Sequence, residues 1–209
     1  MMNHTISYYN KNAEAFCLAT KDADMSFCRD KFLHLLEQKN RIKTKESDKS
    51  KIHILDAGCG SGRDARIFLD AGYQVTALDG SKKMCEEAEK LIKQEVLCIR
   101  FEELQFRQEF DGIWGCASLL HVAYTEINGV LKRFWNALKE EGIFYASFKY
   151  GKGMRIDKGR LFYDYEENAL KKLMINNRFL VENIFVTQDV RKGRENEQWI
   201  NVLAKKQVF

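Results

Sequence analysis

Proline is absent from the 209-residue chain, although it averages about 5% of protein residues. Apolar runs are also short, well below the ~20 residues that a membrane-spanning helix needs. The six cysteines form no C-x-x-C pair, and the four histidines are scattered without the spacing of metal ligands. These absences argue against a transmembrane helix, a metal centre and a framework of structural disulfides.

Composition and charge are those of an ordinary folded domain. Hydrophobic residues make up 45% of the chain, enough for a substantial core, and the net charge is only +4. This mild positive charge falls short of the basic footprint expected of a nucleic-acid-binding protein. The opening residues, "MMNHTISYYN", do not resemble a secretory signal. We therefore expect one domain over residues 1–209 and a cytoplasmic location.

Strands and helices are expected to alternate along most of the chain. Short apolar runs predict strands at 51–58, 73–79, 96–101, 110–120, 143–150, 181–190 and 197–206. Amphipathic stretches predict helices at 61–72, 81–94, 125–142 and 165–179. Such alternation is typical of βαβ units around a mostly parallel sheet. The short segment between the last two strands predicts a hairpin, which places one antiparallel strand in that sheet.

Two further helices are expected before the first strand, at 8–20 and 22–40. We assign residues 1–40 as an N-terminal helical cap. The segment "RIKTKESDKSK", residues 41–51, is charged and has no apolar periodicity. It therefore predicts a solvated loop between the cap and the alternating region, not a linker between domains.

A glycine-rich turn, "DAGCGSG", follows the first strand of the alternating region. Gly58, Gly60 and Gly62 permit a tight turn and leave the backbone open to a ligand. The next helix begins near Gly62, so its free N–H groups face the same place. Asp79 ends the following strand, 21 residues after Gly58. An acidic residue at that distance accepts hydrogen bonds from ribose hydroxyls, so the pattern predicts a ligand that contains ribose.

The spacing of the glycines distinguishes between classes of ribose-containing ligand. Dinucleotide-binding turns have the pattern G-x-G-x-x-G, whereas this turn is G-x-G-x-G with Asp56 two residues before it. A carboxylate there would repel a pyrophosphate but attract an ammonium group. S-adenosylmethionine (SAM) carries ribose, a sulfonium and an amino-acid end, and no phosphate. The turn therefore favours SAM over NAD or FAD.

Residues from about 50 to 205 resemble the class I SAM-dependent methyltransferases. The resemblance rests on "ILDAGCGSGRDA", "VTALDGS", "FDGIWGCASLLHV" and "LKEEGIFYASFK". Within that superfamily the chain is similar to small bacterial methyltransferase-domain and tellurite-resistance-like methyltransferases. The resemblance implies a Rossmann-like α/β fold with about seven strands, mostly parallel with the last one antiparallel, and helices on both faces. It also implies a SAM-dependent enzyme that releases S-adenosylhomocysteine (SAH).

The resemblance implies a set of cofactor-binding residues: Tyr9, Asp56, Ala57, Gly58, Cys59, Gly60, Arg63, Asp79, Gly80, Met84, Phe101, Glu102, Cys116 and Ala117. Asp56 and the backbone from Gly58 to Gly62 would hold the methionine end, where Arg63 is either a carboxylate ligand or a solvent-facing side chain. Asp79 would hold the ribose. Tyr9 would belong to a lid formed by the N-terminal helices.

The adenine and sulfonium positions follow from the same resemblance. Met84 would pack on adenine or in the helix core, and Phe101 would lie at the edge of adenine. The family often has an acidic adenine contact after the third strand, where this chain has Arg100, so Glu102 or the backbone at Phe101 takes that role. Residues 116 and 117 would form the floor beneath the sulfonium.

Sequence patterns say less about the methyl acceptor than about the cofactor. His121 follows the fourth strand of the sheet and is the one candidate general base, or else a histidine that shapes the cofactor pocket. Residues 149–160 contain five basic side chains and one acidic one, with aromatic residues on either side. We interpret this segment as a loop over the cleft. It either attracts an anionic or aromatic acceptor or is simply a solvated basic loop.

Nucleic-acid acceptors fit the sequence less well. Amino-group methylation of DNA typically uses a proline-containing loop after the fourth strand, and this chain has "ASLL" there. We therefore predict methyl transfer to a small molecule at oxygen, nitrogen or sulfur, with no metal, membrane or nucleic-acid partner. The alternatives are an RNA or protein methyltransferase, a SAM-binding module without catalysis, and an NAD-dependent oxidoreductase.

Overall fold

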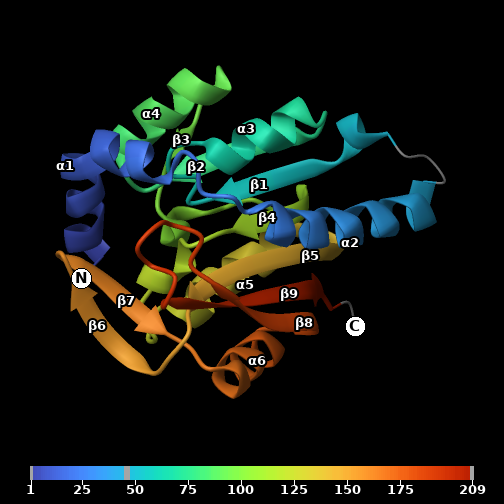
Figure 1. The fold of residues 1–209 in the computed structure, drawn as a ribbon. Helices are drawn as coiled ribbons and strands as arrows, with labels where there is room; N and C mark the ends of the chain where they lie inside the picture. The colour runs from blue at the N-terminus through green and yellow to red at the C-terminus, as the bar shows by residue number, and fades with distance from the viewer. Residues whose placement is uncertain (1, 45–47, 208–209) are drawn as a thin grey trace.

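The computed structural model describes residues 2–44 and 48–207 (Figure 1). Its helices are α1 (Met2–Thr20), α2 (Ser26–Thr44), α3 (Arg63–Asp70), α4 (Lys82–Ile92), α5 (Ile127–Ala137) and α6 (Glu167–Asn176). Its strands are β1 (His53–Ala57), β2 (Gln74–Asp79), β3 (Leu97–Cys98), β4 (Phe110–Gly115), β5 (Leu138–Lys149), β6 (Gly153–Asp157), β7 (Arg160–Asp164), β8 (Phe179–Gln188) and β9 (Gln198–Lys206). Three short 3-10 turns complete the set: η1 (Lys49–Lys51), η2 (Phe101–Glu103) and η3 (Leu119–His121).

Seven strands form one sheet in the order β3-β2-β1-β4-β5-β9-β8. The pairs from β3 to β5 are parallel, whereas β9 is antiparallel to both β5 and β8. This arrangement confirms the expected fold, including the antiparallel last strand. Because β2 and β4 lie on opposite sides of β1, the strand order reverses there, and the carboxyl ends of these strands open a crevice.

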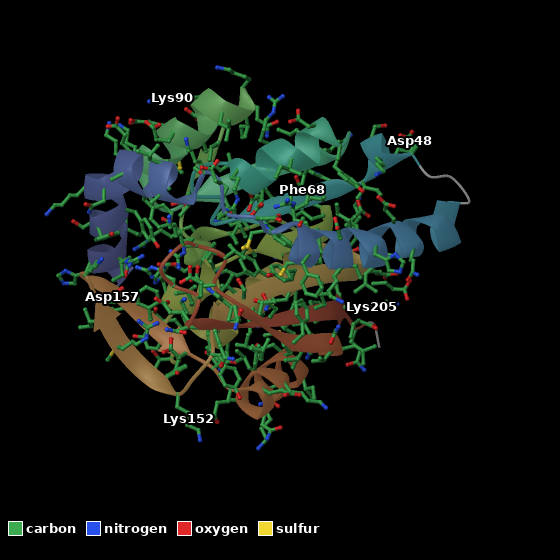
Figure 2. All side chains as sticks on the ribbon, viewed as in Figure 1. Asp48, Phe68, Lys90, Lys152, Asp157 and Lys205 are labelled. Atoms are coloured by element: carbon green, nitrogen blue, oxygen red, sulfur yellow. The ribbon has the colours of Figure 1, made fainter. Side chains whose placement is uncertain are left out.

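Helices cover both faces of the sheet (Figure 1). Along β1, Ile54 faces the layer formed by α2, α3 and α4, and Leu55 faces the layer that includes α5 and α6. Both side chains are fully buried, as the two-residue period of a strand requires when each face is covered. Figure 2 shows Phe68 beneath α3, inside the first layer. These two cores hold the crevice rigidly at one edge of the sheet.

The basic segment after β5 is a hairpin, not the expected loop. β6 and β7 pair antiparallel over residues 153–164, outside the main sheet. Lys158 and Gly159 form the two-residue turn, and both have positive φ, as such hairpin turns require. Tyr124 anchors the hairpin, because its hydroxyl donates to the backbone carbonyls of Gly153 and Asp164 at 2.8 and 2.6 Å.

Several boundaries differ from expectation: α1 starts at Met2 and not at residue 8, and β4 ends at Gly115 and not at residue 120. Helix α2 continues to Thr44, into the segment 41–51 that we expected to be a loop, and η1 occupies its end; residues 45–47 lie outside the described residues. Helix α5 stops at Ala137, not at residue 142, and β5 starts at once. The reason is burial: Leu138 is fully buried and pairs with Phe110, which favours extended backbone over one more helical turn.

Candidate active site

A cleft of about 740 Å³ lies at the carboxyl ends of the parallel strands. The turns after β1, β2 and β4 form its floor, and α1, the hairpin and the segment after β8 form its walls. Most of the expected site residues line it: Tyr9, Asp56, Gly58, Cys59, Gly60, Arg63, Asp79, Gly80, Met84, Phe101, Cys116, Ala117 and His121. Ala57 is fully buried behind the turn, and Glu102 pairs with Arg100 at 3.3 Å outside the cleft.

The glycine turn is shaped by a contact with the segment after β4. Gly58 has a φ of +79°, and a Cβ added there would lie 2.4 Å from the Cβ of Ser118. Glycine is therefore required at this position on two grounds, backbone conformation and space. The Ser118 hydroxyl donates to the carbonyl of Ala57 at 2.7 Å, which fixes the end of β1. Ser118 is a site residue that the sequence did not single out.

Asp79 binds the glycine turn from the neighbouring strand. One carboxylate oxygen accepts from the backbone N–H of Gly60 at 3.1 Å, and the other accepts from that of Ser81 at 2.8 Å. Burial raises the pKa of Asp79, while these backbone donors act in the opposite direction. Asp79 thus fixes the turn to the start of α4 and keeps its remaining lone pairs at the cleft.

Asp56 and Asp64 are two buried carboxylates with opposite surroundings. Asp64 accepts from Arg29 at 2.8 Å, from Arg63 at 2.8 Å and from the indole of Trp114 at 3.1 Å. Asp56 is 3% exposed, and its Oδ2 has no hydrogen-bond partner among the described residues. Burial raises the pKa of Asp56 well above its usual range, and the nearby Asp64 raises it further. A cationic donor bound at Oδ2 would favour the ionised form again, so the site suits such a donor.

The predicted carboxylate ligand Arg63 is already held by the protein. Besides its contact with Asp64, its guanidinium donates to the carbonyl of Thr20 at 3.2 Å, at the end of α1. Arg63 lines the cleft, so it can still offer a donor to a ligand. Its main observed role is to join α1 to the start of α3.

Met84 and Phe101 lie where a flat ring system could enter. Met84 is 1% exposed, and its methyl group is 3.6 Å from where a Cβ on Gly60 would be. It is therefore a core residue that also lines the cleft, so both interpretations of it hold in part. The ring of Phe101 is half-buried and packs edge-on against Phe134 at 5.4 Å. Phe101 lies beside Gly58 and Met84 beside Gly60, so the two apolar side chains flank the glycine turn in the cleft.

Cys116 and Ala117 line the cleft at the end of β4. The backbone N–H of Ala117 donates to the hydroxyl of Ser147 at 2.8 Å, and Ala117 adopts a positive φ of 51°. Burial raises the pKa of the Cys116 thiol, and burial likewise raises that of Cys59. Both thiols therefore stay protonated near neutral pH and act as small apolar groups.

His121 has hydrogen-bond partners on both ring nitrogens. Its Nδ1 donates to the backbone carbonyl of Leu161 at 2.5 Å, since a carbonyl can only accept. Its Nε2 is therefore the acceptor, and the hydroxyl of Tyr9 donates to it at 3.0 Å. Burial lowers the pKa of His121 to about 4, and the positive charges of Arg160 and Arg155 act in the same direction. The ring is neutral near pH 7, with its basic nitrogen covered by Tyr9.

Residues 55–146 match a protein family described as "Methyltransferase domain". Residues 55–146 therefore form a methyltransferase domain by family match, and the strand order is that of the class I methyltransferase fold. A malonyl-[acyl-carrier protein] O-methyltransferase from Acetivibrio thermocellus is 27% identical over 63% of this chain and 46% of its own length. A ubiquinone biosynthesis O-methyltransferase from Pelagibacter ubique is 32% identical over 51% of this chain and 46% of its own.

This methyltransferase domain also resembles solved structures in fold. A 1,6-didemethyltoxoflavin-N1-methyltransferase from Burkholderia thailandensis superposes with a TM-score of 0.71 at 20% identity, covering 99% of this chain and 88% of that one. A magnesium protoporphyrin IX methyltransferase from Synechocystis gives 0.71 at 17% identity, covering 99% of both chains. Similarity at this identity shows the fold alone. The chain spans about half the length of the curated relatives it matches.

The acceptor half of the methyltransferase cleft contains residues that sequence patterns missed. Lys149 is buried at the end of β5, and its ammonium donates to Asp189 at 3.0 Å and to Glu197 at 2.5 Å. Although burial raises the pKa of Asp189, hydrogen bonds from Arg191, Lys149 and Trp199 outweigh it and hold that pKa well below its usual range. Lys149 lies far from the other members in the sequence, so no local motif could have grouped it with Asp189 and Glu197.

Two absences complete the description of the methyltransferase domain. Across residues 2–44 and 48–207 no cluster of three histidine, cysteine or acidic side chains could hold a metal ion. Within the same ranges no helix is both long enough and apolar enough to cross a membrane.

Proposed function

We propose that this protein transfers a methyl group from SAM to a small-molecule acceptor at oxygen, nitrogen or sulfur. The observation that carries the proposal is the unpartnered, buried Oδ2 of Asp56 beside an open glycine turn. An ammonium group would supply the missing donor, whereas the pyrophosphate of a dinucleotide would meet a buried negative charge. The proposal includes a cytoplasmic location, where the six free cysteines would stay reduced.

The residues present fit SAM along its whole length. Asp56 would bind the ammonium, and Asp79 would accept from the ribose hydroxyls. Met84 and Phe101 would bound the adenine, and Cys116 with Ala117 would lie under the sulfonium. SAM supplies a methyl group on a positively charged sulfur, and the carbon–sulfur bond breaks with its electron pair retained by sulfur. The protein's own task is to align the acceptor and to exclude water.

His121 is proposed as the group that accepts a proton from the acceptor. Its Nε2 carries the lone pair, and the bond from Nδ1 to Leu161 fixes the ring orientation. Tyr9 must first leave Nε2, so an acceptor O–H or N–H would replace the phenol hydroxyl there. As the acceptor atom bonds to the methyl carbon, its proton passes to Nε2 and later to solvent. With a pKa of about 4, His121 is a weak base that is fully available at neutral pH.

The acceptor side supports a small molecule that is anionic or aromatic. Phe162 and Tyr9 contribute rings to the cleft, and Arg155 and Arg160 contribute positive charge. The relatives named above include O-methyltransferases of malonyl-[acyl-carrier protein] and of ubiquinone biosynthesis. The fold neighbours include methyltransferases of a didemethyltoxoflavin and of a porphyrin. The ubiquinone, didemethyltoxoflavin and porphyrin names support a small acceptor over RNA or protein.

The first experiment is a calorimetric titration of the purified protein with SAM, SAH and NADH. We expect micromolar binding of SAM and SAH and no heat with NADH. Binding of NADH in their place would overturn the proposal in favour of an oxidoreductase. Transfer of a labelled methyl group from SAM is then followed over a panel of small phenols, amines and thiols, with RNA and protein extracts in parallel. Binding without turnover in every arm would identify a non-catalytic SAM-binding module.

A further inference from the structure

One face of the β6–β7 hairpin forms a wall of the acceptor half of the cleft. Because side chains alternate along a strand, the cross-strand pairs Gly153 with Asp164, Arg155 with Phe162, and Asp157 with Arg160 share one face. The side chains on that face all line the cleft: Arg155, Asp157, Arg160, Phe162 and Asp164. Figure 2 shows Asp157 at the tip of the hairpin beside α1, and Lys152 at its opposite end, pointing away from the molecule.

Arg155 and Arg160 share this face, but their guanidinium N–H groups differ in their hydrogen-bond partners and in their exposure. The Nε of Arg155 donates to Asp164 at 2.8 Å, and its guanidinium is well exposed. Arg160 is only 6% exposed. Its Nη2 donates to Asp157 at 3.2 Å, its guanidinium also interacts with the Tyr9 hydroxyl, and its Nε has no hydrogen-bond partner among the described residues. The edge formed by Nε and Nη2 is the edge at which a carboxylate accepts two parallel hydrogen bonds.

Aromatic rings fix the guanidinium of Arg160 in place. It lies 4.7 Å from the ring centre of Tyr8 and 5.0 Å from that of Phe162. Phe162 also packs edge-on against the ring of His121 at 4.9 Å. The same hairpin strand supplies the Leu161 carbonyl that holds His121. Arg160 and the proton acceptor are thus positioned by adjacent residues of one strand.

We infer that Arg160 binds the carboxylate of an aromatic acceptor and so sets the substrate class. A carboxylate seated on Nε and Nη2 would satisfy the buried orphan donor, which otherwise costs free energy. The aromatic lining beside it, Phe162 and Tyr9, suits a planar ring. A hydroxyl on that ring takes the place of the Tyr9 hydroxyl at Nε2 of His121. This inference rests on the proposed function, because it assigns the second substrate of the same reaction.

The test uses matched acids and amides as probes. The protein is saturated with SAH and titrated calorimetrically with 2-, 3- and 4-hydroxybenzoate and with the corresponding hydroxybenzamides. Each amide keeps the ring and the hydroxyl but loses the negative charge. We expect at least one hydroxybenzoate to bind tenfold more tightly than its amide. Arg160→Gln should reduce that ratio to near one, and Arg160→Lys should leave an intermediate ratio because the charge stays but the two-donor edge is lost.

Lys158→Asn is the control. Lys158 is an exposed residue in the turn of the same hairpin, and asparagine tolerates its positive φ. The Lys158→Asn variant removes one positive charge near Arg160 and so reports any long-range effect of charge on binding. The tenfold preference for the hydroxybenzoate over its amide should persist in this variant. SAH affinity and thermal unfolding, measured for every variant, show that each is folded.

Two kinds of failure are distinguishable. If wild-type protein binds no SAH, the proposed function falls, and this inference falls with it. If SAH binds but acids and amides bind equally or not at all, the inference alone is overturned. A preference for acids that survives Arg160→Gln would equally overturn it, because another group would then hold the carboxylate.

Discussion

Asp56 and Asp64 are both buried, but only Asp64 has hydrogen-bond partners for its whole carboxylate within the described residues. Asp64 is surrounded by two arginines and an indole donor, so its charge is matched within the protein. Asp56 leaves one oxygen without a partner in the described part of the chain. A buried carboxyl oxygen without a partner destabilises the fold, so it persists in a site that a ligand completes.

Replacing each aspartate should separate binding from stability. Asp56→Asn removes a buried carboxyl group that the protein leaves unpaired, so the free energy of unfolding should stay the same or rise while SAH affinity falls at least tenfold. Asp64→Asn weakens the partner of two buried arginines, and the free energy of unfolding should fall by about 2 kcal/mol or more. Urea denaturation and calorimetric titration measure both quantities. Unchanged SAH affinity in Asp56→Asn would remove the ammonium assignment.

Gly58 and Gly60 separate two effects of an added methyl group, a steric clash and an unfavourable positive φ. Gly58→Ala would place a methyl group 2.4 Å from the Cβ of Ser118, whereas at Gly60 the nearest atom is 3.6 Å away. Both sites have positive φ, which costs about 1–2 kcal/mol for alanine. We expect Gly58→Ala to destabilise the protein clearly more than Gly60→Ala. Adding Ser118→Gly should recover the difference, and equal losses in the two single variants would contradict the steric argument.

The buried histidine should make stability depend on pH. The pKa of His121 is about 4 in the folded protein against an ordinary 6.5, so between those values the unfolded chain binds more protons. The contribution of His121 to the free energy of unfolding is therefore fully present above about pH 6.5 and is lost as the pH falls toward 4. Between pH 7.5 and 5, wild type should lose about 1–2 kcal/mol more than His121→Gln. Denaturation curves at the two pH values measure it, and a constant difference would mean that His121 is not buried as described.

At the scale of elements, helix α5 contains a residue that weakens it. Gly129 lies on an exposed position within α5, and no atom lies within 4 Å of where its Cβ would be. Gly129→Ala should therefore raise the free energy of unfolding by about 0.5–1 kcal/mol, through helix propensity and reduced freedom of the unfolded chain. Thermal unfolding detects the change, with SAH affinity as the control because α5 lies outside the cleft. A decrease in stability would show that the helix needs glycine there.

Elements with one clear pattern were predictable, and those with competing patterns were not. Helix α4 lies within the predicted range 81–94, and Ser81 caps it, with its hydroxyl accepting from the N–H of Met84. The end of α5 was misplaced because Lys139, Glu140 and Glu141 are good helix formers, yet burial of Leu138 starts the strand before them. The β6–β7 hairpin was missed because its basic residues resemble a solvated loop. Its signal was the turn "DKGR" between alternating side chains.

The same contrast holds for the site. The cofactor half comes mostly from one continuous stretch, residues 56–84, in which spacing alone fixes relative position. The acceptor half brings together Tyr9, His121 and Leu161, which are far apart in the chain. Their meeting depends on where α1 and the hairpin dock, and local patterns carry no information about docking. The role of His121 therefore stays a prediction, although its partners are now defined.

At the scale of the whole molecule, α1 connects the two halves of the cleft. Near its middle, Asn10 accepts from the hydroxyl of Ser81 at 2.8 Å and from the N–H of Lys83 at 3.1 Å, at the start of α4. Near its start, the hydroxyl of Thr5 accepts from the N–H of Leu161 in the hairpin at 3.1 Å. Helix α1 therefore joins the start of α4 to the β6–β7 hairpin, and Figure 1 shows it between these two elements.

Ligand binding should stabilise α1 together with the rest of the protein. At SAH concentrations 100 times its Kd, stability should increase by about 2.7 kcal/mol, because the ligand binds the folded state alone. Hydrogen exchange measured by mass spectrometry should show slower exchange in residues 2–20 when SAH is present. Exchange in α6, which lies away from the cleft, serves as the internal reference. If α1 exchanges at the same rate with and without SAH, it does not close over the cofactor.

The position of β9 has a consequence for synthesis. β9 lies between β5 and β8 in the sheet, yet residues 198–206 follow every other strand in the sequence. While a ribosome is still making this segment, β5 presents an open edge, and edges of that kind recruit other strands. A nascent chain that lacks β9 therefore already contains the glycine turn and Asp79, but its β8 cannot join the strands from β3 to β5 in one sheet. We expect any translational pause or frameshift before Gln198 to yield aggregates, not a shortened methyltransferase.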